Sequence, residues 1–146
     1  MPRVLSGNED LYVVKNGNSP NVRVTDVQNW MFNQVVGPLT EFFSGKPGSS
    51  QVIYGYVFPA FCRLPKGLPL SQIGVTVAAT GSTALTFNKN GSSIGTATIG
   101  ASGTTATFSF TNDVTFVKGD TLTIVAPGSA DATAANFIIS LVPQFA

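Results

Sequence analysis

Residues 72–142 consist of short threonine-rich segments in which apolar and polar side chains alternate, and turns containing glycine separate these segments. The pattern is clearest in Ala84–Ile99 and recurs in Val117–Val125. Alternation with a period of two is typical of β-strands that bury one face, and short strands spaced about ten residues apart are typical of sandwiches and jelly rolls. We therefore predict a mainly β protein, an antiparallel β-sandwich of jelly-roll-like type.

The same alternation predicts individual strands and the side chains that face the core. Asn88–Gly91 predicts a tight hairpin turn. Ile94 and Ile99 differ in parity, so both can point inward only if Gly95 marks a β-bulge. The predicted strands are 51–58, 73–79, 83–88, 93–99, 104–110, 114–117, 121–126 and 136–142. The predicted inward set is Leu85, Phe87, Ile94, Ile99, Phe108, Phe110, Phe116, Leu122, Ile124, Phe137, Ile139 and Leu141.

The N-terminal part differs in character, and we divide the chain into residues 1–50, an arm with a short helix, and residues 51–146, the sandwich. The arm holds two β-like pieces, 11–14 and 22–24, around a turn signal at Asn16-Gly17. These pieces indicate either a hairpin or an extended arm that orders against a partner.

Residues 25–44 carry the only helical pattern. Thr25 or Asp26 can cap a helix whose apolar side chains recur at three- and four-residue steps, and Gly37-Pro38 should end it near Val36. An irregular segment with Phe42 and Phe43 is expected to follow. The helix either covers the open end of a sheet or anchors the chain to another protein. The candidate attachment residues are Leu11, Tyr12, Val13, Val14, Trp30, Met31, Phe32, Phe42 and Phe43.

Ionisable side chains are scarce, and this scarcity argues against catalysis. The chain has no histidine and 10% charged residues, against about 25% in typical soluble domains. Ser-His-Asp and Cys-His catalytic arrangements and histidine metal sites are therefore excluded. We predict that Cys62 is a buried apolar residue. Aspartates 113, 120 and 131 suit turns better than a calcium site. We predict no enzymatic activity, no metal and no cofactor.

Net charge and hydropathy also limit the classes of partner that this protein can have. A net charge of +1 gives no electrostatic case for nucleic acid, and no apolar run reaches the length of a signal peptide or membrane helix. We therefore expect a protein made in the cytoplasm, with no membrane insertion. Charge depletion is also typical of surfaces that neighbouring subunits cover, which favours a homo-oligomer. Tyr54 and Tyr56 are candidates for stacking on a sugar, so a carbohydrate-binding module remains an alternative.

Several pieces of the β region resemble a known module. They are Ala78–Ser82 (AATGS), Phe87–Thr96 (FNKNGSSIGT), Thr107–Phe110 (TFSF), Phe116–Pro127 (FVKGDTLTIVAP) and Asp131–Ala134 (DATA). Together they resemble a β-sandwich module of tailed-bacteriophage virion proteins, especially tail-fibre and tail-associated structural proteins. The likeness covers about half of the chain, within residues 60–142.

The resemblance implies a structural role in a virion assembled in the host cytoplasm, with major capsid or tail proteins as partners. The chain is short, and it lacks the fibrous repeat or heptads of a shaft. It therefore fits a capsid decoration or cement protein or a head fibre, with a tail-fibre, tail-adaptor or receptor-binding component as the alternative. A host surface glycan is a further candidate partner. The arm and helix would then attach the subunit, and the sandwich would be displayed.

Overall fold

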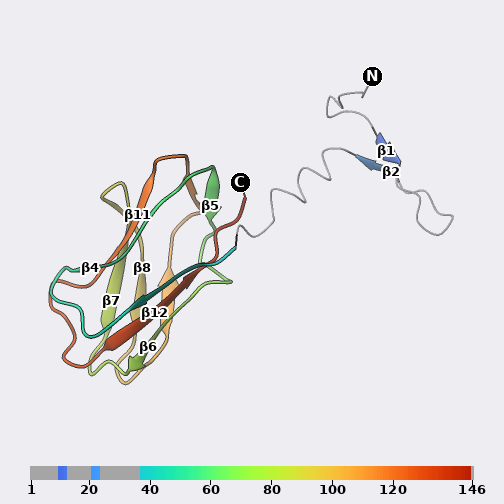
Figure 1. Ribbon diagram of the computed structural model, residues 1–146. Coiled ribbons are helices and arrows are strands. Elements are labelled where there is room, and N and C mark those ends of the chain that lie inside the picture. Colours follow the sequence, from blue (N-terminus) through green and yellow to red (C-terminus); the bar gives the residue numbers. More distant parts are fainter. Residues whose placement is uncertain (1–9, 13–20, 24–36, 146) are drawn as a thin grey trace.

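The computed structural model describes residues 10–12, 21–23 and 37–145 (Figure 1). Within these ranges every regular element is a β-strand, and no helix occurs. The strands are β1 (Asp10–Tyr12), β2 (Asn21–Arg23), β3 (Leu39–Phe43), β4 (Val52–Val57), β5 (Cys62–Leu64), β6 (Gln72–Val77), β7 (Thr83–Lys89), β8 (Ser92–Ile99), β9 (Ala106–Ser109), β10 (Val114–Phe116), β11 (Thr121–Val125) and β12 (Ala135–Leu141). The prediction of a mainly β protein is confirmed.

Two antiparallel sheets form the main body. One sheet has five strands in the order β4-β11-β7-β8-β9, and the other has three in the order β3-β12-β6. Figure 1 shows β6 and β12 in one layer and β4, β7, β8 and β11 in another. A small sheet of β5 and β10 is attached to this body, and β1 pairs separately with β2.

The strand order contains a Greek key. Strands β7, β8 and β9 follow one another as antiparallel neighbours, and β11 returns to lie beside β7. A fourth strand that returns beside the first of three is the defining connection of this motif. At the other edge, a single bridge between Gly74 and Thr105 brings β6 close to the start of β9. The two sheets therefore approach each other along one edge.

The β7–β8 hairpin turns where the sequence predicts it. Asn90 and Gly91 connect the strands with φ values of 48° and 84°. Two consecutive positive φ values define the type I′ turn, which asparagine followed by glycine adopts readily. Farther along, Gly95 pairs with Phe87 while Ser93 pairs with Asn88, so one extra residue is inserted before Gly95. The predicted bulge is confirmed.

The hydrophobic core contains side chains from both large sheets. Phe87 and Leu122 come from the five-stranded sheet, Phe137 and Ile139 from the three-stranded sheet, and each is fully buried. Ten of the twelve predicted inward residues are buried, and the other two, Ile94 and Phe108, are partly buried. Burial of such side chains contributes about 1.5–3 kcal/mol each, so this shared core is the main stabilising feature of the fold.

The structure corrects the prediction for the segment before residue 51. Phe42 and Phe43 lie in strand β3, whose pairing with β12 includes Phe43 with Phe137. The expected irregular segment is therefore wrong, and the sheets extend back to Leu39. Pairing with a long central strand outweighs the weak local pattern, because the ladder satisfies backbone groups and buries Leu39 and Phe43.

Two other N-terminal predictions can be compared with the structure only in part. Antiparallel pairing of β1 with β2 agrees with the hairpin interpretation, whose turn at 13–20 lies outside the described residues. The helix predicted within residues 25–36 also lies outside them.

The strand directions give the body two distinct ends. Leu39 pairs with Leu141, so the chain enters β3 beside the end of the C-terminal strand, as Figure 1 also shows. We call this the proximal end; it also carries the β5–β10 sheet, which Arg63 joins to Gln144. The loops 44–51, 78–82, 100–105 and 126–134 gather at the opposite, distal end. Any attachment through residues before 37 therefore starts at the proximal end.

Candidate interface on the uncharged belt

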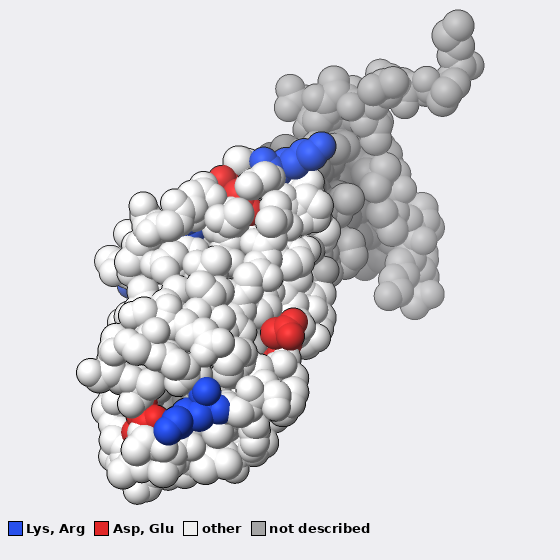
Figure 2. Space-filling view, turned by 60° about the vertical axis from the view of Figure 1, so that its left-hand side comes forward, with Lys and Arg blue, Asp and Glu red and all other residues white. Residues whose placement is uncertain are grey.

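Charged side chains lie mainly at the two ends of the body. Arg63, Lys66, Lys89, Asp113, Lys118 and Asp120 belong to proximal strands and loops, whereas Lys46 and Asp131 belong to distal loops. Among residues 37–145, only Glu41 lies inside a strand between these ends. On the face shown in Figure 2, charged groups lie near the two ends, and one acidic group interrupts the white surface between them. We call this middle zone of the two large sheets, apart from Glu41, the uncharged belt.

The proximal charges stabilise the protein's own loops. Nη1 of Arg63 lies 3.1 Å from Oδ2 of Asp113, and the backbone N–H of Lys66 donates to Oδ1 of the same carboxylate at 2.7 Å. These contacts connect residues about fifty positions apart in the sequence. Asp113 therefore performs a structural task, in agreement with the prediction that it is a turn residue.

Asp120 is held in a second proximal network. Its carboxylate lies 2.9 Å from Nζ of Lys89 and accepts hydrogen bonds from the Asn90 side chain at 2.7 Å and the Val117 N–H at 3.0 Å. The Asn90 hydrogen bond, followed by the Val117 N–H and Lys89, lowers the pKa of Asp120 to about 2. The network fixes the β10–β11 turn against the β7–β8 hairpin.

Asp131 is the corresponding residue at the distal end. Its carboxylate accepts four backbone N–H groups, from Thr80 at 3.0 Å, Gly81 at 2.8 Å, Thr133 at 2.9 Å and Ala134 at 2.8 Å. These donors, with Gly81 the strongest, hold the pKa of this carboxyl far below its usual range. One side chain therefore joins two distal loops.

The outer face of the β3–β12–β6 sheet contains an apolar row within the uncharged belt. Phe137, Ile139 and Leu141 point into the core, so alternation directs Ile138 outward, where it is 51% exposed. Ile138 pairs with Phe42 on one side and with Gly74 on the other. Phe42 is 55% exposed, and Gly74 has no side chain. Across the row, the exposed side chain therefore decreases in size from the ring of Phe42 to the aliphatic Ile138 and then to Gly74, where only backbone is present.

Hollows lie on both sides of the Ile138 ridge. A groove of about 680 Å³ extends from the Gly74 side to β9, and its lining includes Leu68, Thr105, Phe108 and Ser140. A shallower hollow of about 420 Å³ lies on the Phe42 side. The side chains that line the two hollows are apolar, hydroxyl or amide groups, apart from Glu41, which lines the shallower one. The face thus presents a projection and a recess without charge between them.

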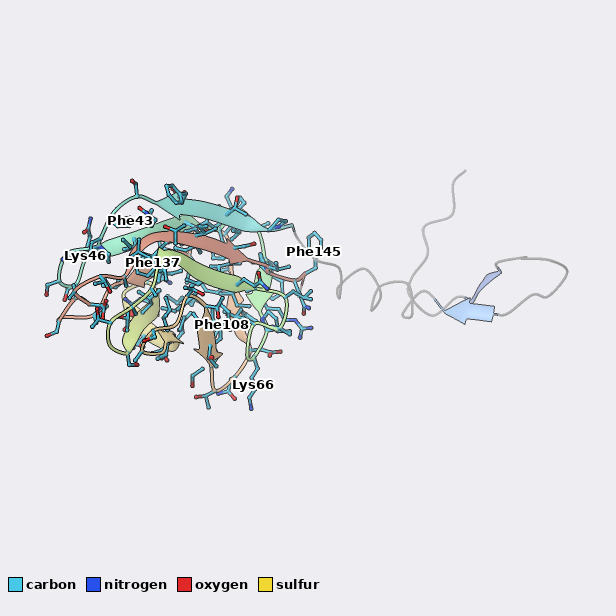
Figure 3. All side chains as sticks on the ribbon, turned by 90° about the horizontal axis from the view of Figure 1, so that it is seen from below. Phe43, Lys46, Lys66, Phe108, Phe137 and Phe145 are labelled. Carbon is cyan, nitrogen blue, oxygen red and sulfur yellow. The ribbon has the colours of Figure 1, made fainter. Side chains whose placement is uncertain are left out.

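The predicted attachment residues are dispersed rather than gathered in one site. Phe43 points inward and meets Phe137 edge to face, with ring centroids 6.5 Å apart, whereas Phe42 points outward. Figure 3 labels Phe43 and Phe137 close to each other. Leu11 and Tyr12 lie in β1. The others, Val13, Val14, Trp30, Met31 and Phe32, lie outside the described residues.

Tyr54 and Tyr56 do not form an exposed aromatic platform. Tyr54 is 6% exposed and pairs with Ile124, and burial raises the pKa of its phenol to about 12. Tyr56 is half-buried and packs edge to face on Phe58 at 5.0 Å. A register shift opposite Val125 lets both Ile53 and Tyr54 turn inward. The expectation that Tyr54 offers a ring to a sugar is therefore not met.

The sequence reasoning missed Ile138 and Gly74 as surface features. The signal for Ile138 was present, because it lies between Phe137 and Ile139, two positions assigned to the core. An isoleucine at the outward position between them is exposed unless something covers it. Gly74 carries no such local signal, since its place in the row depends on pairing with β12.

Comparison with protein-family models, with curated proteins and with solved structures finds no match. In the part of the chain that the structure describes, no three acidic or cysteine side chains gather in a group that could hold a metal ion. The same part holds no helix that is long and apolar enough to cross a membrane.

Proposed function

We propose that this protein is a non-enzymatic structural subunit of a tailed-bacteriophage virion, a capsid decoration or cement protein or a head fibre. The observation that carries the proposal is that the charged side chains stabilise the protein's own loops and are scarce on the strands between the two ends. Asp113, Asp120 and Asp131 bind the protein's own loops. Among residues 37–145, Glu41 is the one charged residue in the strands between the ends, which otherwise carry apolar, hydroxyl and amide side chains. Such a surface suits packing among many copies better than recognition of a charged substrate.

We further propose that the two sheets form a β-sandwich of jelly-roll type. The Greek-key order of β7, β8, β9 and β11, the insertion of β12 between β3 and β6, and the shared core support this assignment. Jelly rolls occur in viral capsid and lectin domains, so the fold alone fits more than one role.

The proposal assigns the two ends different tasks. The chain enters β3 at the proximal end, so attachment through the N-terminal segment would turn that end toward the major capsid or tail protein. The distal loops 44–51, 78–82, 100–105 and 126–134 would then face away from the particle. Tight hydrogen bonds such as those of Asp131 suit an exposed tip, because they hold loops that no neighbour supports.

Localisation on particles tests this function. Particles produced with and without the gene are purified through a density gradient, and quantitative mass spectrometry measures the copy number of the chain per particle. A fixed, high copy number together with antibody label on the head supports decoration. Label on the tail would move the protein to the alternative, a tail-fibre, tail-adaptor or receptor-binding component. Absence from purified particles overturns the virion role.

A carbohydrate-binding module in host adhesion is the second candidate, and its support is the proposed jelly-roll fold, which lectin domains also adopt. It predicts binding on an array of host glycans by the full chain. Because Tyr54 is buried, loss of binding in Tyr54→Ala would have to be separated from loss of folding. Tyr56→Ala is the sharper variant, since the Tyr56 side chain is only partly covered.

A further inference from the structure

We propose that the outer face of the β3–β12–β6 sheet is the surface on which a second copy of this chain packs, with Phe42 of one copy seated in the groove beside Gly74 of the other. This inference rests on the proposed function, for which it names the contact between copies. It concerns a face of the body itself and not the N-terminal segment from which attachment was predicted.

The shape of this face is self-complementary. Phe42, Ile138 and Gly74 form one cross-strand row in which side-chain size falls from a projecting ring to no side chain. A groove of about 680 Å³ lies at the low end of the row, lined by Phe108, Leu68 and Ile138 among others. The ring at the high end can cover the apolar part of this groove, at Phe108 and Ile138, while Gln72 and Thr107 keep part of the lining polar. One copy therefore supplies both the projection and the recess.

The charge pattern is compatible with a second copy of the chain and disfavours charged occupants. In a two-fold contact between identical subunits the same surface lies on both sides, so a charge close to the symmetry axis meets its own kind. The outward residues of the three strands include Thr40, Phe42, Gln72, Thr76, Ile138 and Ser140, and none of these is ionisable. Glu41, which lines the hollow on the Phe42 side, is the one charged residue of these three strands. A nucleic acid or an acidic peptide would need cations here, and this row offers none.

The exposed apolar side chains on this face are also adjacent. Phe61 is as exposed as Phe42, at 51% and 55%, but it lies in the loop before β5, outside the three-stranded sheet. Single exposed apolar residues are ordinary, whereas neighbouring ones beside an apolar groove mark contact surfaces. The pair Phe42 and Phe61 therefore provides a matched comparison of the same residue type at nearly equal exposure.

The test is the oligomeric state of the full chain, measured by sedimentation velocity over a concentration series. The wild-type chain is expected to associate, and Phe42→Ser is expected to raise the dissociation constant by about 30-fold, the effect of removing a strong interface anchor. Phe61→Ser is expected to leave it within about twofold of wild type. Far-UV circular dichroism and the urea midpoint confirm that both variants fold, since both rings are half exposed.

A charge placed on the face provides a second, independent variant. Thr40→Lys brings a cation to the contact on both copies and is expected to dissociate the assembly, with recovery at high salt. Thr111→Lys adds the same charge at an exposed proximal turn and is expected to have no effect. Equal effects of the two lysines, or of the two phenylalanine variants, would place the contact elsewhere.

The outcomes separate this inference from the virion role. A wild-type chain that remains monomeric at all concentrations overturns the inference and leaves this face to the chain's own N-terminal residues or to another protein, while particle incorporation can still stand. Association that depends on Phe42, in a chain absent from particles, supports the inference and overturns the virion role.

Discussion

The ring of Phe110 lies directly against the backbone of Gly95. A Cβ atom at residue 95 would lie 2.7 Å from Cγ of Phe110 and 2.8 Å from its two Cδ atoms. The ring has little room to retreat, because it is 5% exposed and meets Phe87 edge to face at 5.1 Å. Glycine at the β8 bulge is therefore required by close packing and not by its φ angle.

Gly95→Ala is expected to reduce the free energy of unfolding by about 1–3 kcal/mol, the typical cost of overpacking a core. Urea denaturation measures this loss. Gly55→Ala is the matched control, since Gly55 also lies within a strand and has nothing within 4 Å of its added Cβ. In a Phe110→Ala background the cost of Gly95→Ala should shrink, and an unchanged cost would contradict the proposed contact.

Asp131→Asn is expected to lower the urea midpoint, because an amide cannot replace this carboxylate. Oδ1 accepts hydrogen bonds from Thr80, Thr133 and Ala134, whereas Oδ2 accepts one from Gly81. With asparagine, the side-chain N–H₂ group must replace one of the two oxygens. Two hydrogen-bond donors, this N–H₂ group and a backbone N–H, then face each other, and that hydrogen bond is lost. Hydrogen exchange should rise at these amides. Unchanged exchange at Thr80 and Gly81 would show that the loops do not depend on Asp131.

Acid stability should report on Asp120. Its pKa is about 2 in the folded protein, below the value of about 3.9 for an unfolded aspartate. The unfolded state therefore takes up the proton first as the pH falls, so the contribution of Asp120 is fully present above about pH 4 and is lost toward pH 2. Urea midpoints between pH 5 and pH 2 should fall less steeply in Asp120→Asn than in wild type. Parallel curves would contradict the assignment.

Cys62 should be protected in the folded state. The side chain is 4% exposed, and burial raises the pKa of its thiol to about 11. A disulfide reagent at pH 8 is expected to react roughly a hundredfold or more slowly with native protein than with protein in urea, because little thiolate is present and access is blocked. Cys62→Ser should abolish the reaction in both states. Fast labelling of native protein would indicate that the β5–β10 sheet opens readily.

Local patterns in the sequence were sufficient for most strands. The alternation around Leu85, Phe87 and Ile99 places these side chains in the core, as found. Asn90-Gly91 specifies its own turn, since both residues accept positive φ values. Such features depend on a few neighbouring residues, and they can therefore be read without knowing what lies across the sheet.

The candidate site was much less predictable. Phe42 and Phe43 were grouped as attachment residues, yet the β3–β12 pairing sends one to the surface and the other to Phe137. Tyr54 was expected to be exposed, but a bulge turns it inward. A single change in pairing or register reverses the face that a side chain occupies. Burial in short segments thus depends on partners that the local sequence does not identify.

The sequence by itself determined that this protein is mainly β, where most strands of residues 72–142 lie, and that few ionisable groups are available for chemistry. The tertiary structure decided which distant residues meet. It joined Asp131 to Thr80 and Gly81, and it aligned Phe42, Ile138 and Gly74 in one row across three strands. The physical reason is range: strand periodicity and turn preference act over a few residues, whereas strand order is set by the burial of a core that the whole chain shares.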